Sequence, residues 1–412
     1  MVHPAAQSFD ARPAGGLRGN APFGWFAGSL ALWSGAVGMQ QVLFSWLVLG
    51  ELRASAEWMG TAQMFQSLPS LLFLLVGGAT ADRRDRRRLL LVLHVAAAAA
   101  AGAMGFVVAA GGLGMGAVLV YGLGWGTTQA FALPARDALI SDVAGGDLVR
   151  AITAATLIQF AAAALGSRAA GWAAHQGTPV GLAMQAALVM LGFALLWRVP
   201  PPPPHAAVSA RGGTVAAIRA GLREVRRSPR LWPIALLVAA DGLFFMGPFA
   251  VLCPLMVRDV YHGGVNDLSR VMMTLPIGTI AGSLLVLLRR GIRRRGRVFL
   301  LALMGVALCL IGLSAQPPLW GFMLIIFAWG AFHSLFFNTS RTLFQEGALA
   351  SHRARILSIH SLGLLGMAPL SNLAAGFLGR LVGPGTAIAL FGGAMVVIVA
   401  AAWGLSDVRR MD

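Results

Sequence analysis

The sequence predicts an all-α membrane protein with twelve transmembrane helices. Hydrophobic residues make up 57% of its 412 positions and charged residues only 11%, whereas charged residues make up about 25% of an ordinary soluble domain. The apolar residues fall in runs of about twenty or more, which are long enough to cross a hydrocarbon core of about 30 Å as helices. Helices are expected because a backbone in lipid must satisfy its own hydrogen bonds.

The longest apolar runs give the positions of the spans. We expect them at approximately 23–50, 57–81, 89–110, 113–134, 151–174, 178–198, 231–257, 267–288, 298–315, 317–340, 354–382 and 384–405. The chain then divides into a tail (1–22), a six-helix half (23–198), a polar linker (199–230), a second six-helix half (231–405) and a short tail (406–412). Two halves of equal span number suggest a duplication.

The basic residues are distributed unequally between the two sides of the predicted membrane protein. All 32 are Arg, and 27 of them fall in the tails, the linker and the loops on one side, which we call the arginine-rich end. The positive-inside rule places that end in the cytoplasm. We therefore expect a multi-pass protein of the inner (cytoplasmic) membrane with both termini cytoplasmic. The net charge of +17 does not indicate nucleic-acid binding, because no loop is large enough for a binding domain.

The linker has two parts. It opens with Pro200 to Pro204, which favour an extended chain, and continues with Thr214 to Arg230, an Arg-rich stretch with a helical pattern. It either lies on the cytoplasmic surface against anionic lipid or serves as a solvated tether that fixes the topology.

A glycine- and arginine-rich segment joins the second and third spans. It reads Gly-Gly-Ala-Thr-Ala-Asp-Arg-Arg-Asp-Arg-Arg-Arg over 77–88. The segment resembles the loop between helices 2 and 3 of the major facilitator superfamily, and the matching positions are Gly78, Asp82, Arg83, Arg86 and Arg87. The resemblance implies two six-helix halves that work by alternating access and a gating role for these residues. A topological role for the Arg cluster is the alternative.

The version of the motif with Asp85 is similar to one branch, the exporters related to the enterobactin exporter, also known as transmembrane secretion effectors. Stretches at 39–48, 130–136, 338–345 and 353–369 also resemble that branch. Three positions depart from its pattern, because Ala132 replaces an acid, Ala163 replaces an Arg and Ser167 replaces a Pro.

Two charged residues lie deep inside predicted spans, where a charge is costly unless it faces a cavity or a partner. Asp241 lies near the middle of the seventh span. We expect it to bind a proton or a cationic substrate, with a structural carboxylate as the alternative. Arg168 lies deep in the fifth span. It could bind an anionic group, pair with Asp241 or extend toward the membrane interface.

Several uncharged polar residues also lie within the spans. In the fold that the resemblance implies, Gln40, Gln41, Gln129, His333 and Asn338 are possible cavity-lining residues, although each could equally join neighbouring helices. We find no paired carboxylates, metal-ligand cluster or activated nucleophile, so we expect neither an enzyme nor a metal site.

The resemblance implies a secondary transporter without cofactors that takes its energy from the proton gradient. We expect a monomeric, proton-coupled exporter of an amphipathic small molecule, either a drug-like compound or a siderophore. Its partners would be that solute and membrane lipids. A lysophospholipid or other lipid transporter, or a non-transporting membrane sensor with the same fold, is the alternative.

Overall fold

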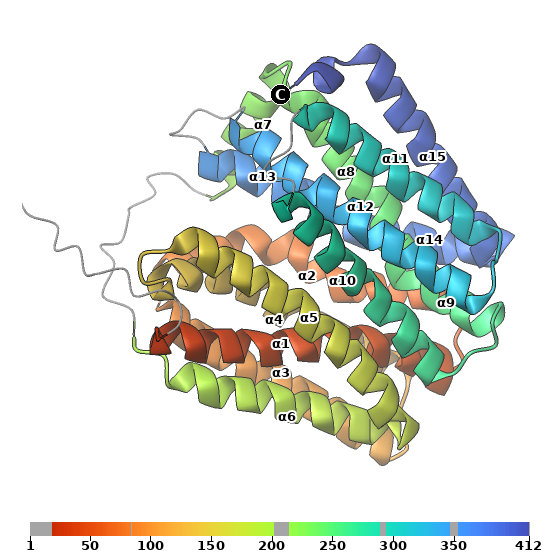
Figure 1. Cartoon of the computed structure of the whole chain (residues 1–412). Coiled ribbons are helices and arrows are strands. Elements are labelled where there is room, and N and C mark those ends of the chain that lie inside the picture. The colour runs from red at the N-terminus through yellow and green to blue at the C-terminus, as the bar shows by residue number, and fades with distance from the viewer. Residues whose placement is uncertain (1–18, 84, 202–213, 289–293, 347–352, 412) are drawn as a thin grey trace, which may run out of the picture.

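The computed structural model describes residues 19–83, 85–201, 214–288, 294–346 and 353–411. Within these ranges, the side chains of residues 74–79, 81–83, 214–220 and 353–358 lie outside the description. All secondary-structure elements of the described residues are helices, and these helices form two bundles (Figure 1). This agrees with the predicted all-α fold class.

The helices follow one another with short connections. They are α1 (Ala21–Trp46), α2 (Ala56–Arg83), α3 (Arg86–Ala109), α4 (Met115–Val143), α5 (Leu148–His175), α6 (Thr178–Trp197), α7 (Thr214–Arg227), α8 (Leu231–Gly247), α9 (Cys253–Asp259), α10 (Val265–Leu288), α11 (Arg295–Ser314), α12 (Leu319–Glu346), α13 (Arg353–Gly366), α14 (Ala368–Val382) and α15 (Pro384–Leu405). The π-helical segments η1 (Leu47–Glu51) and η2 (Pro248–Leu252) continue α1 and α8, and the 3-10 turn η4 (Asp407–Arg410) follows α15.

The predicted twelve spans correspond to the described helices other than α7 and η4. Ten of the described helical segments are long and apolar enough to cross a membrane by length and composition. The other two spans, α2 and α4, are also long enough, with 28 and 29 residues. Both carry polar side chains that line the cavity described below.

Two of the spans are interrupted rather than continuous. The seventh span passes from α8 through η2 into α9, and prolines at 248 and 254 stand at the two junctions. The predicted single helix over 354–382 is instead divided at Met367, directly before the Ala368-Pro369 start of α14. Proline has no backbone N–H to donate and therefore favours such breaks.

The two halves use the same close helix contact at corresponding places. A Cβ added to Gly126 of α4 would lie 1.9 Å from the Gln66 carbonyl oxygen of α2. A Cβ added to Gly330 of α12 would lie 2.2 Å from the Leu275 carbonyl oxygen of α10. Only glycine permits these approaches. The repeat of one contact between the second and fourth helices of each half is what a duplicated bundle would show.

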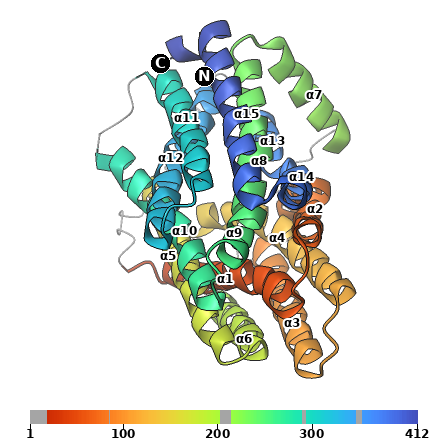
Figure 2. The same cartoon turned by 90° about the vertical axis from the view of Figure 1, so that its right-hand side faces the viewer.

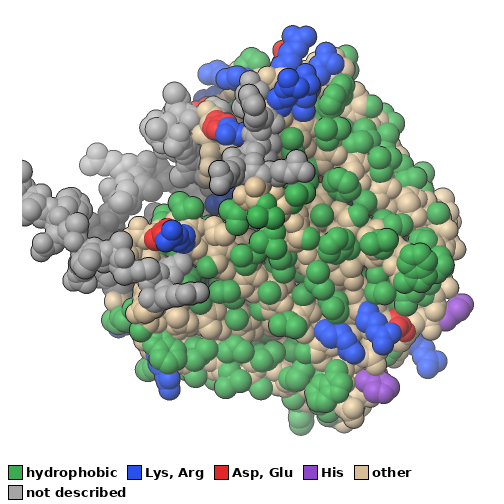
Figure 3. Space-filling model, viewed as in Figure 1, with side chains coloured by type: hydrophobic (Ala, Val, Ile, Leu, Met, Phe, Trp, Pro, Cys, Tyr) green, Lys and Arg blue, Asp and Glu red, His purple; other side chains and the backbone are tan. Residues whose placement is uncertain are grey.

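The linker helix α7 lies beside α13 and α8, where Val225 is fully buried. Of the proline run, Pro200 and Pro201 are described, whereas 202–204 lie outside the described residues. Figure 3 shows a broad hydrophobic surface whose charged side chains gather near its borders, as expected for a surface that faces lipid.

The halves meet along two helix pairs. Figure 2 shows α2 beside α14 and α5 beside α10, and these pairs are in contact. Each pair joins one helix of the first half to one of the second.

Candidate functional site

A polar cavity of about 230 Å³ lies in the N-terminal half between α1, α2 and α4. Its lining side chains are amides, hydroxyls and one indole, together with small apolar groups. They are Val37, Gln40, Gln41, Gln66, Ser67, Ser70, Trp125, Gly126 and Gln129. None of these described lining residues carries a charge, so the cavity suits an uncharged solute that forms hydrogen bonds.

A buried amide network forms one wall of this cavity. The Gln40 amide donates to Oε1 of Gln66 at 3.0 Å, and its own oxygen accepts from Gln185 of α6 at 2.8 Å. The Tyr121 hydroxyl also donates to Gln40. The polar atoms of this wall therefore satisfy one another, which holds Gln40 in place and accounts for its burial in an apolar bundle.

Other polar groups of the cavity remain available to a solute. Within the described part of the chain, the Gln41 amide and the Ser70 hydroxyl form no side-chain hydrogen bond. Gln129 accepts from the Trp33 indole at 3.0 Å, which leaves its amide N–H groups free to donate. These three groups come from three helices and can converge on one molecule.

The cavity is closed toward the arginine-poor end of the molecule. Asn372 of α14 donates to the Gln63 carbonyl and to the Ser67 hydroxyl of α2, both at 3.1 Å. Further along the same helix pair, a Cβ added to Gly60 would lie 2.7 Å from Cα of Gly376. The backbones of α2 and α14 therefore touch, and no solute can pass between them in this state.

Polar contacts also join the halves at that end. Arg380 of α14 pairs with Glu57 of α2 at 2.8 Å, and Arg258 of α9 donates to the Ala54 carbonyl. Arg168 of α5 donates to Asn266 of α10 at 3.4 Å. Together with Asn372 they form the closed gate, the name used below for these contacts across the arginine-poor end.

The C-terminal half contains a buried carboxyl group. Asp241 of α8 is 0% exposed, and neither of its oxygens has a hydrogen-bond partner among the described residues. His333 of α12 lies beside it, with Nε2 3.5 Å from Oδ2 of Asp241. An isolated ionised carboxylate is costly in such surroundings unless a partner neutralises its charge.

His333 is the exposed member of this pair. Its side chain is 21% exposed, and Phe337 and Arg341 follow at intervals of four residues on the same side of α12. Arg341 interacts electrostatically with Asp137 of α4, which belongs to the other half. This side of α12 therefore faces the other half at Arg341, two turns from His333.

Pairing with Asp241, one of the three roles considered for Arg168, is not what the structure shows. Arg168 lies on α5 in the closed gate with Asn266, whereas Asp241 lies on α8 against His333. The sequence could not separate these arrangements, because the partner of a buried carboxyl is set by helix packing. Asn338, another predicted cavity residue, is exposed on α12 and donates to the Ser334 carbonyl at 2.9 Å.

The motif at the arginine-rich end is described in part. Gly78, Asp82 and Arg83 belong to α2, and the side chains of Asp82 and Arg83 lie outside the described residues. Arg86 donates to both carboxylate oxygens of Asp142 of α4 at 2.9 Å. Arg87 donates to the Leu196 and Trp197 carbonyls at the end of α6. These two side chains join α3 to its neighbours within the N-terminal half.

Three functional contacts were not singled out from the sequence. Tyr121 and Gln185 support Gln40, and Asn372 closes the cavity. Each is an isolated polar residue in an apolar span, and this pattern could have indicated a buried contact. The sequence contains many such residues, so the pattern does not single out these three.

A family comparison decides what kind of protein has this arrangement. The model of the major facilitator superfamily matches residues 24–365. The chain belongs to the major facilitator superfamily. It is accordingly a multi-pass membrane transporter rather than an enzyme, as the sequence predicted. The branch of exporters related to the enterobactin exporter remains a resemblance, and no curated protein matches the chain in sequence.

Solved structures share the fold over nearly the whole chain. A mutant of the nucleoside transporter NupG is similar with a TM-score of 0.78 and 13% identity, over 93% of this chain and 99% of that one. A D-xylose-proton symporter has a TM-score of 0.70 and 12% identity, over 96% and 99% of the two chains. An inward-facing bacterial homologue of the human lysosomal transporter Spinster has a TM-score of 0.67 and 14% identity, over 94% and 96%. At these identities the likeness concerns the fold alone.

Proposed function

We propose that this major facilitator protein is a proton-coupled exporter of a neutral amphipathic small molecule. The observation that carries the proposal is the Asp241–His333 pair, a fully buried carboxyl group 3.5 Å from a partly exposed histidine. A carboxyl in that position can take up and release one proton per cycle, because its charged form is stable only with a partner.

The polar cavity supports the choice of solute. Its amides and hydroxyls can bind hydrogen-bonding groups, and the face of Trp125 can pack against a flat apolar part. The absence of charged side chains among its described lining residues favours a neutral drug-like compound over a siderophore-like acid. Two structural neighbours, which transport nucleosides and D-xylose, also handle uncharged solutes.

The closed gate supports alternating access. If the arginine-rich end is cytoplasmic, as the positive-inside rule indicates, the described state is closed toward the outside. A solute entering from the cytoplasm would reach the cavity and stop at Asn372. Export would then require the gate to open while the residues of the 77–88 motif close the other end, and proton binding at Asp241 would drive the return.

The experiment measures solute-induced proton movement in proteoliposomes that enclose a pH-sensitive dye. Nucleosides, neutral amphipathic drugs, lipophilic cations and siderophore-like acids are compared for the wild type and for Asp241→Asn. Proton movement with neutral probes, lost in the mutant while solute exchange persists, is the expected result. Equal proton movement in both proteins would remove Asp241 from coupling. Movement of lysophospholipid instead of these probes would favour the lipid transporter, and binding without movement would favour the sensor.

A further inference from the structure

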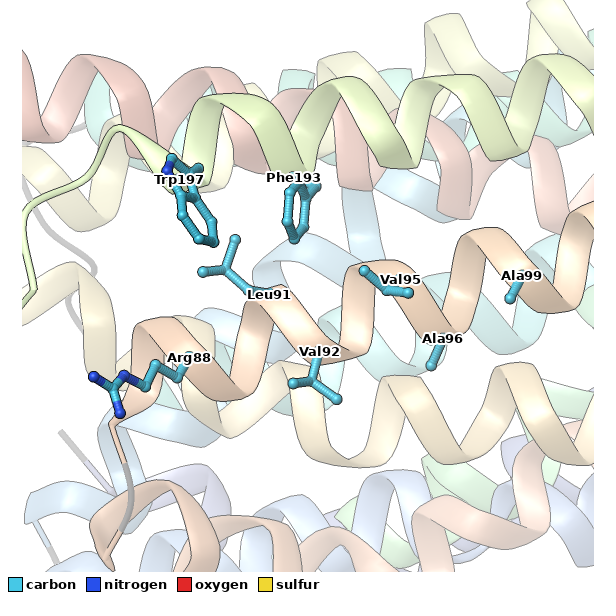
Figure 4. A pocket seen from close by; sticks show the side chains of 8 residues that line it. All are labelled: Arg88, Leu91, Val92, Val95, Ala96, Ala99, Phe193 and Trp197. Carbon is cyan, nitrogen blue, oxygen red and sulfur yellow. The ribbon is translucent and has the colours of Figure 1, made fainter.

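A groove of about 630 Å³ runs along the outer surface of the N-terminal half between α3 and α6. Figure 4 shows Phe193 and Trp197 of α6 standing over the α3 residues Val92, Val95 and Ala96. The small Ala96 and Ala99 side chains form the floor of the groove and leave space between these larger groups. Val92 is 65% exposed and Trp197 is 61% exposed, so the groove opens to the membrane and not to the transport cavity.

The groove results from the way the two helices pack. On their inner sides α3 and α6 approach closely, since a Cβ added to Gly192 would lie 3.3 Å from the His94 ring. On their outer sides the helices are separated by alanines, which cannot fill the space. An apolar groove facing lipid will hold an apolar chain, because the exposed hydrocarbon surface is then packed.

Positive charge is concentrated at the arginine-rich end of this groove. The Arg88 side chain borders the groove and is 83% exposed, and Arg87 lies with its guanidinium 5.4 Å from the Trp197 ring centre. The acidic neighbour is Asp85, which lies 3.4 Å from Arg88 and also accepts from the Arg88 backbone N–H as the cap of α3. One carboxylate cannot occupy the five N–H donors of Arg88, so most of them point to solvent.

We propose that the groove between α3 and α6 binds an anionic phospholipid. One acyl chain lies along Val92, Val95 and Ala96, and the phosphate is bound by Arg88. The charge at the groove mouth favours an anionic headgroup over a zwitterionic one, because basic groups at the membrane surface attract anionic lipids. The site is independent of the transport cavity and of the proposed coupling pair.

The molecule offers a matched control for the arginine. Asp147 caps α5 by accepting from the Arg150 backbone N–H at 3.1 Å, and the two side chains pair at 3.2 Å. This repeats the Asp85–Arg88 arrangement at the start of another helix, where Arg150 does not line the groove. Ala103 is the matched control for Ala96 in the floor of the groove, because it is also exposed on α3 but does not line the groove.

Native mass spectrometry of the full chain would test the proposal with phosphatidylglycerol and phosphatidylcholine of identical acyl chains. The wild type should bind phosphatidylglycerol about fivefold more tightly, which is the expected effect of one arginine at the membrane surface. Arg88→Gln should remove this preference and Arg150→Gln should keep it. Ala96→Phe should reduce the retention of both lipids, whereas Ala103→Phe should not.

Three results would overturn the proposal. The first is equal affinity of the wild type for the two lipids. The second is an equal loss of preference in Arg88→Gln and Arg150→Gln. The third is a dimer that excludes lipid, which would mean that a second copy of the chain covers the groove. Unchanged melting temperatures of the four variants in detergent would show that misfolding does not explain the outcome.

Discussion

The two halves of this transporter share a helix scaffold but bury their polar groups in different ways. In the N-terminal half, Gln40 is surrounded by Gln66, Tyr121 and Gln185, which satisfy its donors and acceptors. In the C-terminal half, Asp241 is equally buried and has no hydrogen-bond partner among the described residues. A neutral network that satisfies itself is stable in apolar surroundings, whereas a lone carboxyl responds to the arrival of a proton.

This difference suggests that the two halves have separate roles, one in solute binding and the other in proton coupling. The amide groups of the first half can bind a neutral solute without a change in charge, and the carboxyl of the second half can link a proton to the conformational cycle. Because the same glycine contacts hold both bundles together, the scaffold itself does not account for the difference. The distinction comes from a few side chains, and it can be tested by changing them separately.

The largest effect is expected from removing the neighbour of Asp241. His333→Gln should lower proton-coupled flux about 100-fold, because a positioned proton-transfer group contributes about that factor. Solute exchange without a proton gradient should stay within a few-fold of the wild type. Both rates can be measured in the same proteoliposomes.

The matched control for His333 is His360, another histidine of the C-terminal half. His360 is buried and lies 2.9 Å from the Ser340 hydroxyl, away from Asp241. His360→Gln should leave coupling unchanged even if it lowers stability. An equal loss of coupling in both variants would mean that His333 acts only through the fold.

The shared scaffold should be sensitive in both halves. Gly126→Ala and Gly330→Ala each place a methyl group about 2 Å from a backbone carbonyl oxygen, which should cost about 1–3 kcal/mol by overpacking. Thermal unfolding of the purified protein in detergent should show a lower melting temperature for both variants. Gly124→Ala and Gly393→Ala should be nearly neutral, since no atom lies within 4 Å of a Cβ added at either position. A lower melting temperature in only one of Gly126→Ala and Gly330→Ala would contradict the equivalence of the two glycine contacts.

The scaffold could be predicted from the sequence, while the site was predictable only in part. Apolar runs gave twelve spans because hydrophobic length is a local property, and the Arg distribution divided the molecule into two ends. The break at Met367 was missed, since the adjacent Pro369 is compatible with a kinked continuous helix. Asp241 was predicted to be buried from its depth in a span. Its partner was not predicted, because His333 lies 92 residues further along the chain and meets it only through packing.

A smaller effect is expected at a free group of the cavity. Gln41→Ala removes an amide that lines the cavity without supporting other side chains, so the KM for a transported solute should rise about tenfold or less, the value of one hydrogen bond. The melting temperature and the proton-to-solute ratio should not change. Gln40→Ala provides the contrast, because it removes one hydrogen-bond partner from each of Tyr121 and Gln185 and should lower both affinity and stability. A changed proton-to-solute ratio in Gln41→Ala would contradict the separation of binding from coupling.

The smallest effect is expected at the rim of the closed gate. Arg380→Gln removes the ion pair with Glu57. Because the Arg380 side chain is 63% exposed, this should lower the stability of the closed state by only about 0.2–1 kcal/mol. Spin labels at Ala110→Cys and Ala315→Cys, exposed residues at the arginine-poor end of the two halves, would report this as a greater share of long distances. Arg270→Gln is the control, because Arg270 pairs with Asp267 of its own helix at 3.3 Å and does not join the halves. If both variants give the wild-type distance distribution, the gate is held by the Asn372 bridge and by the Gly60–Gly376 contact, and the ion pair at its rim contributes nothing measurable.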